Sequence, residues 1–368
     1  MESNVMLDSQ KANSPHTKRI VAKWNQRGGQ MAVNEYVKVW NARKWLKEAE
    51  PFLKVWHAYL GYSLNLFSYF KNGAKVAEVA DKHGLKVELL SRWVEVGLAV
   101  GHLRESKGDK IKTKQKMGKY LTKESKHSVG ILLEELFELH MPTLLSYREQ
   151  LPNKQQEPPP NMADMVAGTS SFLEALAVPK IAAIIKKRKA ESVLDVGCGY
   201  GGYLKRLAHT FPRTKFEGIE VDHDVCVSAR KNNLNENVSI IEGDFFHFQG
   251  KRAYDVLMFN NILYYFSTDT RVEIFKRAAA QLATDGVLIV ISPVTDGKHG
   301  KRFATAFNSF MSAHKKMHPL PSKKELVRTS KQAHFRLLSA KTIVKEGGWQ
   351  FLLFEKHGKY EKENCYKR

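Results

Sequence analysis

The chain has 368 residues, with 59 Lys and Arg against 38 Asp and Glu, and its formal net charge at pH 7 is +21. That length suggests two domains, and the charge favours anionic partners without choosing among nucleic acid, acidic protein and small acids. No apolar run is long enough to span a bilayer, the N-terminus lacks a secretory signal, and the three cysteines have no disulfide or zinc spacing. We therefore expect a cytoplasmic protein without a membrane or metal partner.

The first part of the chain predicts helices. Residues 1–30 are polar and end Gly/Gln-rich, which indicates a loosely held arm. Helical periodicity then runs from Asn34 to Phe70 with an interruption. Residues 31–152 are expected to form one mostly helical domain.

Within that domain lies a compact pattern. Lys75–His83 and Lys86–Val96 predict two short helices, with Gly84 as the C-cap of the first. Two short strands, Gly101–Arg104 and Lys110–Thr113, follow around a Lys-Gly-Asp turn. This order is that of a winged helix-turn-helix.

Three further segments lead to the second domain. Ser128–Gln150 predicts one long helix, and Pro158–Pro160 is the clearest linker in the chain. Met162 to about Lys187 predicts helices again, so residues 153–190 are expected to connect the domains.

Residues 191–368 predict an α/β domain, because short β-rich runs alternate with helical stretches. The expected strands are Val193–Val196, Lys215–Glu220, Val238–Ile241, Asp255–Phe259, Gly286–Ile291, Phe335–Val344 and Trp349–Phe354. The last two are separated by a loop of hairpin length, so we expect a parallel Rossmann-like sheet with an antiparallel C-terminal edge.

The strongest motif closes the first of these strands. It contains Asp195, Gly197, Gly199, Gly201 and Gly202, at the place where an open α/β sheet binds its ligand. Glycines there let backbone N–H groups approach a ligand closely. The glycines alone would also fit a nicotinamide dinucleotide, but a carboxylate two residues before the first glycine suits a cationic amino group better than a pyrophosphate.

This segment resembles motif I of the class I S-adenosylmethionine-dependent methyltransferases. The resemblance covers roughly Met162 to Lys356 and implies S-adenosylmethionine as cofactor. It implies that Glu220, rather than Asp222, binds the ribose hydroxyls, and that Asp244 and Phe245 bind the adenine amino group and ring. The expected cofactor site is completed by the residues of motif I and one asparagine: Asp195, Gly197, Gly199, Gly201 and Asn260.

The whole chain is similar to bacterial small-molecule O-methyltransferases of natural-product pathways. In that family a winged-helix-like N-terminal domain forms an intertwined homodimer and does not bind DNA. The apolar density that such an interface needs is present in four segments: Leu60–Tyr69, Leu132-Leu133, Leu136-Phe137 and Leu144-Leu145. The resemblance therefore implies a homodimer through the N-terminal domain.

One departure from the family concerns the catalytic base. The family's histidine after the fourth strand is replaced here by Tyr264, and the following aspartate by Tyr265. Tyrosine is a poor base at neutral pH, and the two tyrosines also remove the iron ligands of relatives that methylate carbon. We name Tyr264 as the residue at the catalytic position, expect it to orient the acceptor, and place Asn261 and Tyr265 at the acceptor.

A second candidate base lies in the segment before the closing hairpin. Phe303, Phe307, Phe310 and His314 fall on one helical face. The three phenylalanines are candidate acceptor-binding residues, although such a stripe is more often plain core. His314 is a candidate base, although a lone histidine there is usually structural.

These patterns favour methyl transfer to a small, anionic metabolite in a biosynthetic pathway. O-methylation of a carboxylate or hydroxyl is favoured over N- or C-methylation. The alternatives are a methyltransferase that acts on a peptide, a carrier-bound intermediate or RNA, and a cofactor-sensing regulator that binds DNA. Nucleic acid is not favoured, because the helix that would read bases carries Glu88 and Glu95, which phosphate would repel.

Overall fold

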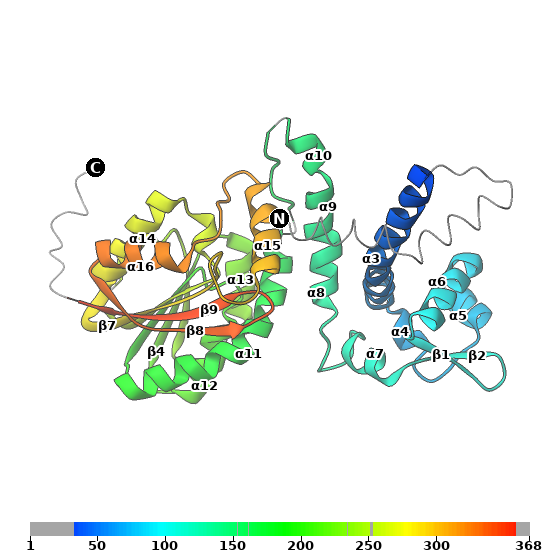
Figure 1. Cartoon of the computed structure of the whole chain (residues 1–368). Coiled ribbons are helices and arrows are strands. Elements are labelled where there is room, and N and C mark those ends of the chain that lie inside the picture. The colour runs from blue at the N-terminus through cyan, green and yellow to red at the C-terminus, as the bar shows by residue number, and fades with distance from the viewer. Residues whose placement is uncertain (1–32, 153, 161, 234, 251–252, 358–368) are drawn as a thin grey trace. The chain divides into compact units, whose positions relative to one another are not determined.

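The computed structural model describes residues 33–357 except 153, 161, 234 and 251–252. Contacts divide the chain after Gly130 into two compact units, residues 1–130 and 131–368 (Figure 1). The predicted limits of the domains stay predictions. The predicted arm, residues 1–30, lies outside the described residues. No helix in the described ranges is long and apolar enough to cross a membrane.

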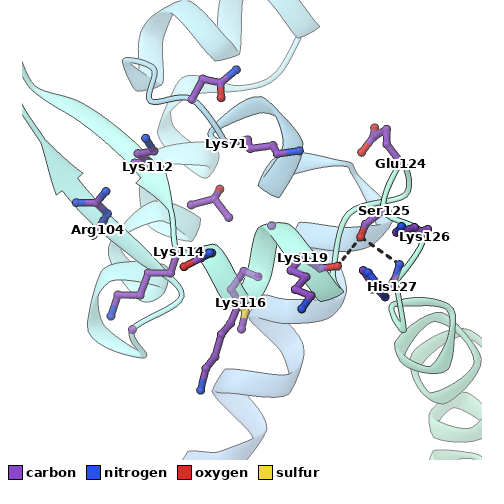
Figure 2. A pocket seen from close by; sticks show the side chains of 16 residues that line it. Lys71, Arg104, Lys112, Lys114, Lys116, Lys119, Glu124, Ser125, Lys126 and His127 are labelled. Atoms are coloured by element: carbon purple, nitrogen blue, oxygen red, sulfur yellow. Dashed lines mark hydrogen bonds between the residues drawn. The ribbon is translucent and has the colours of Figure 1, made fainter.

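The N-terminal unit has the predicted helices and hairpin, although the first strand begins two residues later than predicted and the helix α7 was not predicted. Gly84 ends α5 with φ +63°, a left-handed conformation that glycine adopts without strain. β1 and β2 form an antiparallel hairpin. The elements are α3 (Val33–Ser63), α4 (Leu66–Tyr69), α5 (Val76–His83), α6 (Val87–Ala99), β1 (Leu103–Ser106), β2 (Lys110–Thr113) and α7 (Gln115–Tyr120). The turn after α4, the hairpin and α7 surround a hollow whose lining includes six lysines and Arg104 (Figure 2).

An aromatic core holds this unit together. Phe67 and Phe70 are buried, and the ring of His57 stacks on Trp93 with centroids 4.2 Å apart. Burial and the neighbouring His102 lower the pKa of His57 to about 3, so the ring is neutral at physiological pH. Leu66 is buried as well, so part of the stretch predicted as a dimer interface, Leu60–Tyr69, belongs to this core instead.

The predicted single helix over Ser128–Gln150 is wrong in detail. The segment forms α8 (Ile131–Glu134), a π-helical turn η1 (Glu135–His140), α9 (Met141–Leu145) and α10 (Tyr147–Gln150). Pro142 has no N–H to give to a carbonyl one turn earlier, which explains why regular α-helical bonding stops there. In the π-helical turn η1 the backbone hydrogen bonds join residues five apart instead of four apart. Its side chains therefore point in other directions than they would on an α-helix.

The second unit has the predicted α/β fold. Its sheet has the order β5-β4-β3-β6-β7-β9-β8, and β7, β9 and β8 pair antiparallel while the other pairs are parallel. The strands are β3 (Ser192–Val196), β4 (Lys215–Glu220), β5 (Val238–Glu242), β6 (Tyr254–Asn260), β7 (Leu282–Pro293), β8 (Phe335–Val344) and β9 (Trp349–Lys356). The fold-class prediction for this unit is confirmed.

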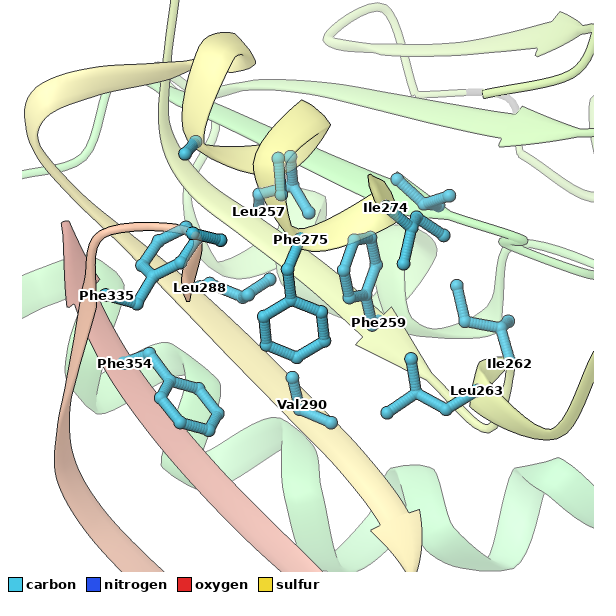
Figure 3. Close-up of a cluster of buried hydrophobic side chains, with 14 of the residues drawn as sticks. Leu257, Phe259, Ile262, Leu263, Ile274, Phe275, Leu288, Val290, Phe335 and Phe354 are labelled. Atoms are coloured by element: carbon cyan, nitrogen blue, oxygen red, sulfur yellow. The ribbon is translucent and has the colours of Figure 1, made fainter. Parts of the chain in front are cut away.

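Helices cover both faces of the sheet. The helical elements are α11 (Met162–Arg188), α12 (Gly202–Thr210), α13 (His223–Asn232), η2 (Leu263–Tyr265), α14 (Thr268–Gln281), α15 (Lys301–Ser312) and α16 (Lys323–Gln332). Apolar residues of α11, α12 and α13 form the core on one face, and those of α14 and α16 the core on the other. Phe275 of α14 lies at the centre of the second core, between Phe259 and the strands of the hairpin (Figure 3). This packing holds the parallel strands β3 to β7 in place, and their carboxyl ends lie along one edge of the sheet.

Candidate active site

The glycine-rich turn after β3 lies where the strand order reverses. β3 pairs with β4 on one side and with β6 on the other, which is the position where open α/β sheets bind ligands. Gly197 has φ +66°, and a Cβ there would lie 2.6 Å from Ile262 Cγ2. Gly201 has φ +72°, and a Cβ there would lie 2.4 Å from Asn233 Nδ2. The turn therefore needs glycine at both positions.

A cavity of 540 Å³ opens beside this turn. It is lined by residues that end β3, β4, β5 and β6, and six of the predicted cofactor residues are among them: Gly197, Gly199, Glu220, Asp244, Phe245 and Asn260. The volume is in the range of ordinary small-molecule sites. Two predicted residues do not line it, because Gly201 packs on Asn233 and Asp195 is buried next to the cavity. The structure thus brings the predicted cofactor residues to one place.

Asp195 is the most unusual group of the site. It is fully buried, and its Oδ1 accepts a hydrogen bond of 2.9 Å from Asn260 Nδ2, while its Oδ2 has no partner. Burial, and next the charges of Glu174 and Glu220, raise the pKa of this carboxyl well above its usual range. Asn260 Oδ1 is also buried without a partner. Two unsatisfied acceptors side by side fit a cationic donor such as an ammonium group.

Glu220 is held in position at the end of β4. One of its carboxylate oxygens accepts from Gly199 N at 3.0 Å, and the other accepts from Val221 N and Asp222 N. Asp222 itself caps α13 by accepting from Val225 N at 3.0 Å. Both carboxylates line the cavity and both already accept from backbone N–H groups, so these hydrogen bonds do not choose between Glu220 and Asp222.

The turn after β5 supplies a flat apolar wall. Phe245 is buried and meets Phe259 edge to face, with centroids 5.9 Å apart. Asp244 is exposed, and its Oδ1 accepts from Phe246 N at 2.9 Å, which fixes the turn. An aromatic ring beside an exposed carboxylate is suited to a planar ligand that carries an amino group.

The residues predicted at the acceptor divide into two groups. Asn261 and Tyr265 line the cavity, and Asn261 Oδ1 accepts from Trp349 Nε1 at 2.9 Å. Burial, and next the charges of Glu220 and Glu135, raise the pKa of Tyr265 to about 12. Tyr265 is therefore protonated at neutral pH and can donate a hydrogen bond.

Phe307, Phe310 and Tyr264 lie in a separate apolar cluster instead. The rings of Tyr264 and Phe307 are 5.7 Å apart, whereas Phe303 is half exposed and contacts Trp349. Burial is the main reason that the pKa of Tyr264 lies well above its usual range. A buried phenol of this kind does not accept protons at neutral pH.

His314 is placed away from the cavity. It lies beyond the end of α15, is fully buried, and its Nδ1 is 3.0 Å from Phe310 O. Its Nε2 lies 3.2 Å from Gln156 Nε2. These contacts tie the linker to the end of α15, and His314 does not line the cavity, so its role as a base stays a prediction.

The π-helical turn η1 brings together a pair that sequence reasoning missed. Glu135 Oε1 and His140 Nε2 are 3.3 Å apart, close enough for an ion pair but without hydrogen-bond geometry, and each side chain is 12% exposed. The ring of His140 packs on Phe310 and Phe307, at 4.3 and 5.7 Å. Residues five apart diverge on an α-helix and converge only where bonding is i to i+5, so no helical periodicity predicts this pair.

No three His, Cys, Asp or Glu side chains group as a metal site within the described part of the chain.

Comparisons with known proteins agree with this geometry. A protein-family profile described as "Methyltransferase domain" matches residues 193–286. The chain is 31% identical to trans-aconitate 2-methyltransferase of Afipia carboxidovorans, over 30% of this chain and 41% of the relative. It is 32% identical to the dTDP-3-amino-3,6-dideoxy-alpha-D-glucopyranose N,N-dimethyltransferase of Streptomyces fradiae, over 30% and 43%. The chain thus spans less than half the length of these curated relatives.

Solved structures resemble nearly the whole chain. An O-methyltransferase family protein from Burkholderia thailandensis has a TM-score of 0.70 and 18% identity, covering 89% of this chain and 99% of that one. Human N-acetylserotonin methyltransferase in complex with SAM has a TM-score of 0.72 and 14% identity, covering 86% and 98%. At this identity the likeness shows the fold. Residues 193–286 are therefore a methyltransferase domain, and the fold is that of the class I S-adenosylmethionine-dependent methyltransferases.

The burial of Asp195 leads to a prediction about stability. Its raised pKa means that the folded chain keeps this proton to higher pH than the unfolded chain does. The free energy of unfolding therefore falls as pH rises above the unfolded-state pKa of about 3.9. Asp195→Asn keeps an acceptor for Asn260 and removes the ionisation. It should raise the free energy of unfolding at neutral pH by on the order of 1 kcal/mol and flatten its dependence on pH.

Urea unfolding of the cofactor-free protein at several pH values measures this effect. The control is Asp244→Asn, which changes an exposed carboxylate of the same cavity and should leave stability unchanged. Loss of stability in Asp195→Asn at neutral pH would mean that the carboxylate is satisfied in the folded chain.

Proposed function

We propose that the chain transfers the methyl group of S-adenosylmethionine to a small, anionic metabolite in a biosynthetic pathway. The observation that carries this proposal is the buried Asp195 carboxylate, with its unpartnered Oδ2 beside the glycine turn of a methyltransferase domain. A cationic amino group placed there would supply the donor that this oxygen lacks. A nicotinamide dinucleotide would bring a pyrophosphate to the same point, where the two negative charges would repel.

The other cavity residues fit the remaining parts of the cofactor. Glu220, held by three backbone N–H groups, is placed to accept from both ribose hydroxyls, and Asp244 to accept from the adenine amino group. Phe245 would pack against the adenine ring. When bound, the cofactor supplies a methyl group made electrophilic by its sulfonium. The residues of the chain then have to orient the acceptor and exclude water.

The acceptor is proposed to be held by Asn261 and Tyr265, since both line the cavity. The charge of +21 favours an anionic acceptor, and O-methylation of a carboxylate or hydroxyl is the favoured reaction. Phe307 and Phe310 lie deeper, in the cluster with Tyr264, and support this wall by packing. A carboxylate would need no base, whereas a hydroxyl would.

For a hydroxyl acceptor, we propose His140 as the base and Glu135 as its positioning residue. The ring of His140 contacts Phe307, which also contacts Tyr264, the residue at the family's base position. The charge of Glu135 contributes to the raised pKa of Tyr265, which lines the cavity. Neither side chain lines the cavity, so the acceptor hydroxyl would have to extend past Tyr265 into the aromatic cluster for the imidazole of His140 to take its proton.

Calorimetry of cofactor binding tests the proposal as a whole. S-adenosylhomocysteine should bind with micromolar affinity and NAD far more weakly. Glu220→Ala should cost on the order of 1.5–3 kcal/mol of binding free energy, the range of hydrogen bonds to a charged group. Asp296→Ala is a matched control, because that carboxylate caps α16 and does not line the cavity. Tighter binding of NAD, or a loss below about 0.5 kcal/mol for Glu220→Ala, would contradict these assignments.

Substitutions of Tyr264 and His140 test the roles of the two residues. A screen of phenols and carboxylic acids with methyl-labelled cofactor supplies the acceptor. With a phenol, Tyr264→Phe should keep turnover within about tenfold, the scale of one neutral hydrogen bond. His140→Gln should lose about 10²–10⁴-fold, and the loss should shrink at high pH, where the phenol ionises by itself. Unchanged affinity for S-adenosylhomocysteine is the folding control.

Either of two results would overturn this assignment. A thousandfold loss in Tyr264→Phe would make Tyr264 the base, and wild-type turnover in His140→Gln would remove His140 from the chemistry.

We also propose a homodimer formed through the N-terminal unit. Large apolar side chains are exposed along α3, among them Trp45 at 74% and Leu46 at 72%. Monomeric surfaces seldom expose such a row. The same helix carries both lysines and glutamates, so a second copy placed antiparallel to it would match charge as well as apolar surface. A second copy of this chain is therefore the proposed occupant.

Light scattering of the full chain tests the dimer. The wild type should have twice the mass of one chain, and the double variant Trp45→Glu, Leu46→Glu should be a monomer because it buries two charges at the interface. Leu89→Glu, on an equally exposed position of α6, is the control and should remain a dimer. A monomeric wild type, or a dimeric double variant, would refute an α3 interface.

A further inference from the structure

The hollow in the N-terminal unit is lined by an unusual concentration of cations. It has a volume of 1090 Å³ and is bounded by the turn after α4, the β1–β2 hairpin, α7 and the loop that follows (Figure 2). We call it the basic hollow and define it by seven side chains: Lys71, Arg104, Lys112, Lys114, Lys116, Lys119 and Lys126. All lie within residues 1–130, so the hollow belongs to one unit.

Negative charge is scarce among the described residues that line the basic hollow. Glu124 is the one carboxylate among the lining residues, and its oxygens accept from Ser68 Oγ at 2.7 Å and from Asn65 Nδ2 at 3.0 Å. These hydrogen bonds, and above all the one from Ser68, lower the pKa of Glu124. The carboxylate of Glu124 is therefore held by residues of the N-terminal unit itself. Within the described residues, none of the seven cations forms an ion pair. Like charges gathered in a concave surface attract anions strongly.

The arrangement of the cations indicates an extended ligand. Arg104 and Lys112 face each other across the hairpin register, and Lys114, Lys116 and Lys119 continue along the start and length of α7. Lys126 lies on the far side, beyond α7 (Figure 2). A compact anion would need donors that converge on one point, whereas a row of separate cations matches a chain of regularly spaced charges.

An exposed aromatic ring adjoins this row. Tyr120 at the end of α7 is 40% exposed, and Lys119 Nζ lies 5.1 Å from the centre of its ring. Sites for single-stranded nucleic acid combine a basic groove for the backbone with aromatic rings on which bases stack. An acidic peptide would use the cations but not the ring.

We propose that the basic hollow binds the phosphodiester backbone of a single-stranded nucleic acid, with a base stacked on Tyr120. From the sequence, nucleic acid is not favoured because the helix that would read bases, α6, carries Glu88 and Glu95. The basic hollow is formed by other elements. This inference is independent of the proposed methyl transfer and needs no base-specific contact.

Fluorescence anisotropy with labelled twelve-nucleotide oligouridine and oligothymidine, at 50 and 200 mM NaCl, tests the inference on the full chain. The variant Lys112→Gln, Lys114→Gln, Lys116→Gln should weaken binding by at least about tenfold at 50 mM. It should also reduce the slope of log affinity against log salt by about two, since each phosphate contact on a single strand contributes about 0.7. The matched control, Lys205→Gln, Lys231→Gln, Lys341→Gln, removes three exposed cations of the second unit and should change affinity less than about twofold.

Tyr120→Ala separates nucleic acid from other polyanions. It should weaken binding of both oligonucleotides at least about fivefold with little change in salt slope, because stacking carries no charge. Poly-L-glutamate of equal charge should compete poorly. Equal losses in the two triple variants would show attraction by net charge alone. Full competition by poly-L-glutamate, with no effect of Tyr120→Ala, would identify an acidic chain instead. No binding of either oligonucleotide at 50 mM would overturn the inference outright.

Discussion

The buried carboxylate of Asp195 constrains the position of most other groups in the site. It accepts a hydrogen bond from Asn260, so it joins the ends of β3 and β6 across the point where the strand order reverses. Glu220 joins β4 to the same turn through Gly199 N. An acid kept this far from water costs stability unless a cation balances it. The buried acid lies where β3, β4 and β6 end, which is where a ligand with an ammonium group would bind.

The cofactor half of the site could be predicted from sequence because it is local. Glycines with positive φ, an acid at the end of a strand and the alternation of strands and helices all leave short-range patterns. The strands predicted from residues 193–354 appear with shifts of a few residues at their ends, the largest at the start of β7. The predicted cofactor residues consequently line one cavity or lie beside it.

The acceptor half depends on long-range packing, and there the sequence was insufficient. The stripe of phenylalanines on α15 predicted one helix face correctly but could not tell that Phe307 and Phe310 meet Tyr264 and His140 in a closed cluster. His314 follows the same spacing, yet α15 ends at Ser312 and the ring is bound to the linker. The Glu135–His140 pair depends on a π-helical turn, and no hydrophobic periodicity in the sequence predicts such a turn.

The most direct measurement of the central claim is a crystal structure of the chain with S-adenosylhomocysteine. The account predicts the amino group of the ligand beside Asp195 Oδ2, both ribose hydroxyls on Glu220 and the adenine against Phe245. The sulfur should then point toward Tyr265 and the aromatic cluster that holds His140. A ligand bound elsewhere, or bound in this cavity with its amino group turned away from Asp195, would contradict the account.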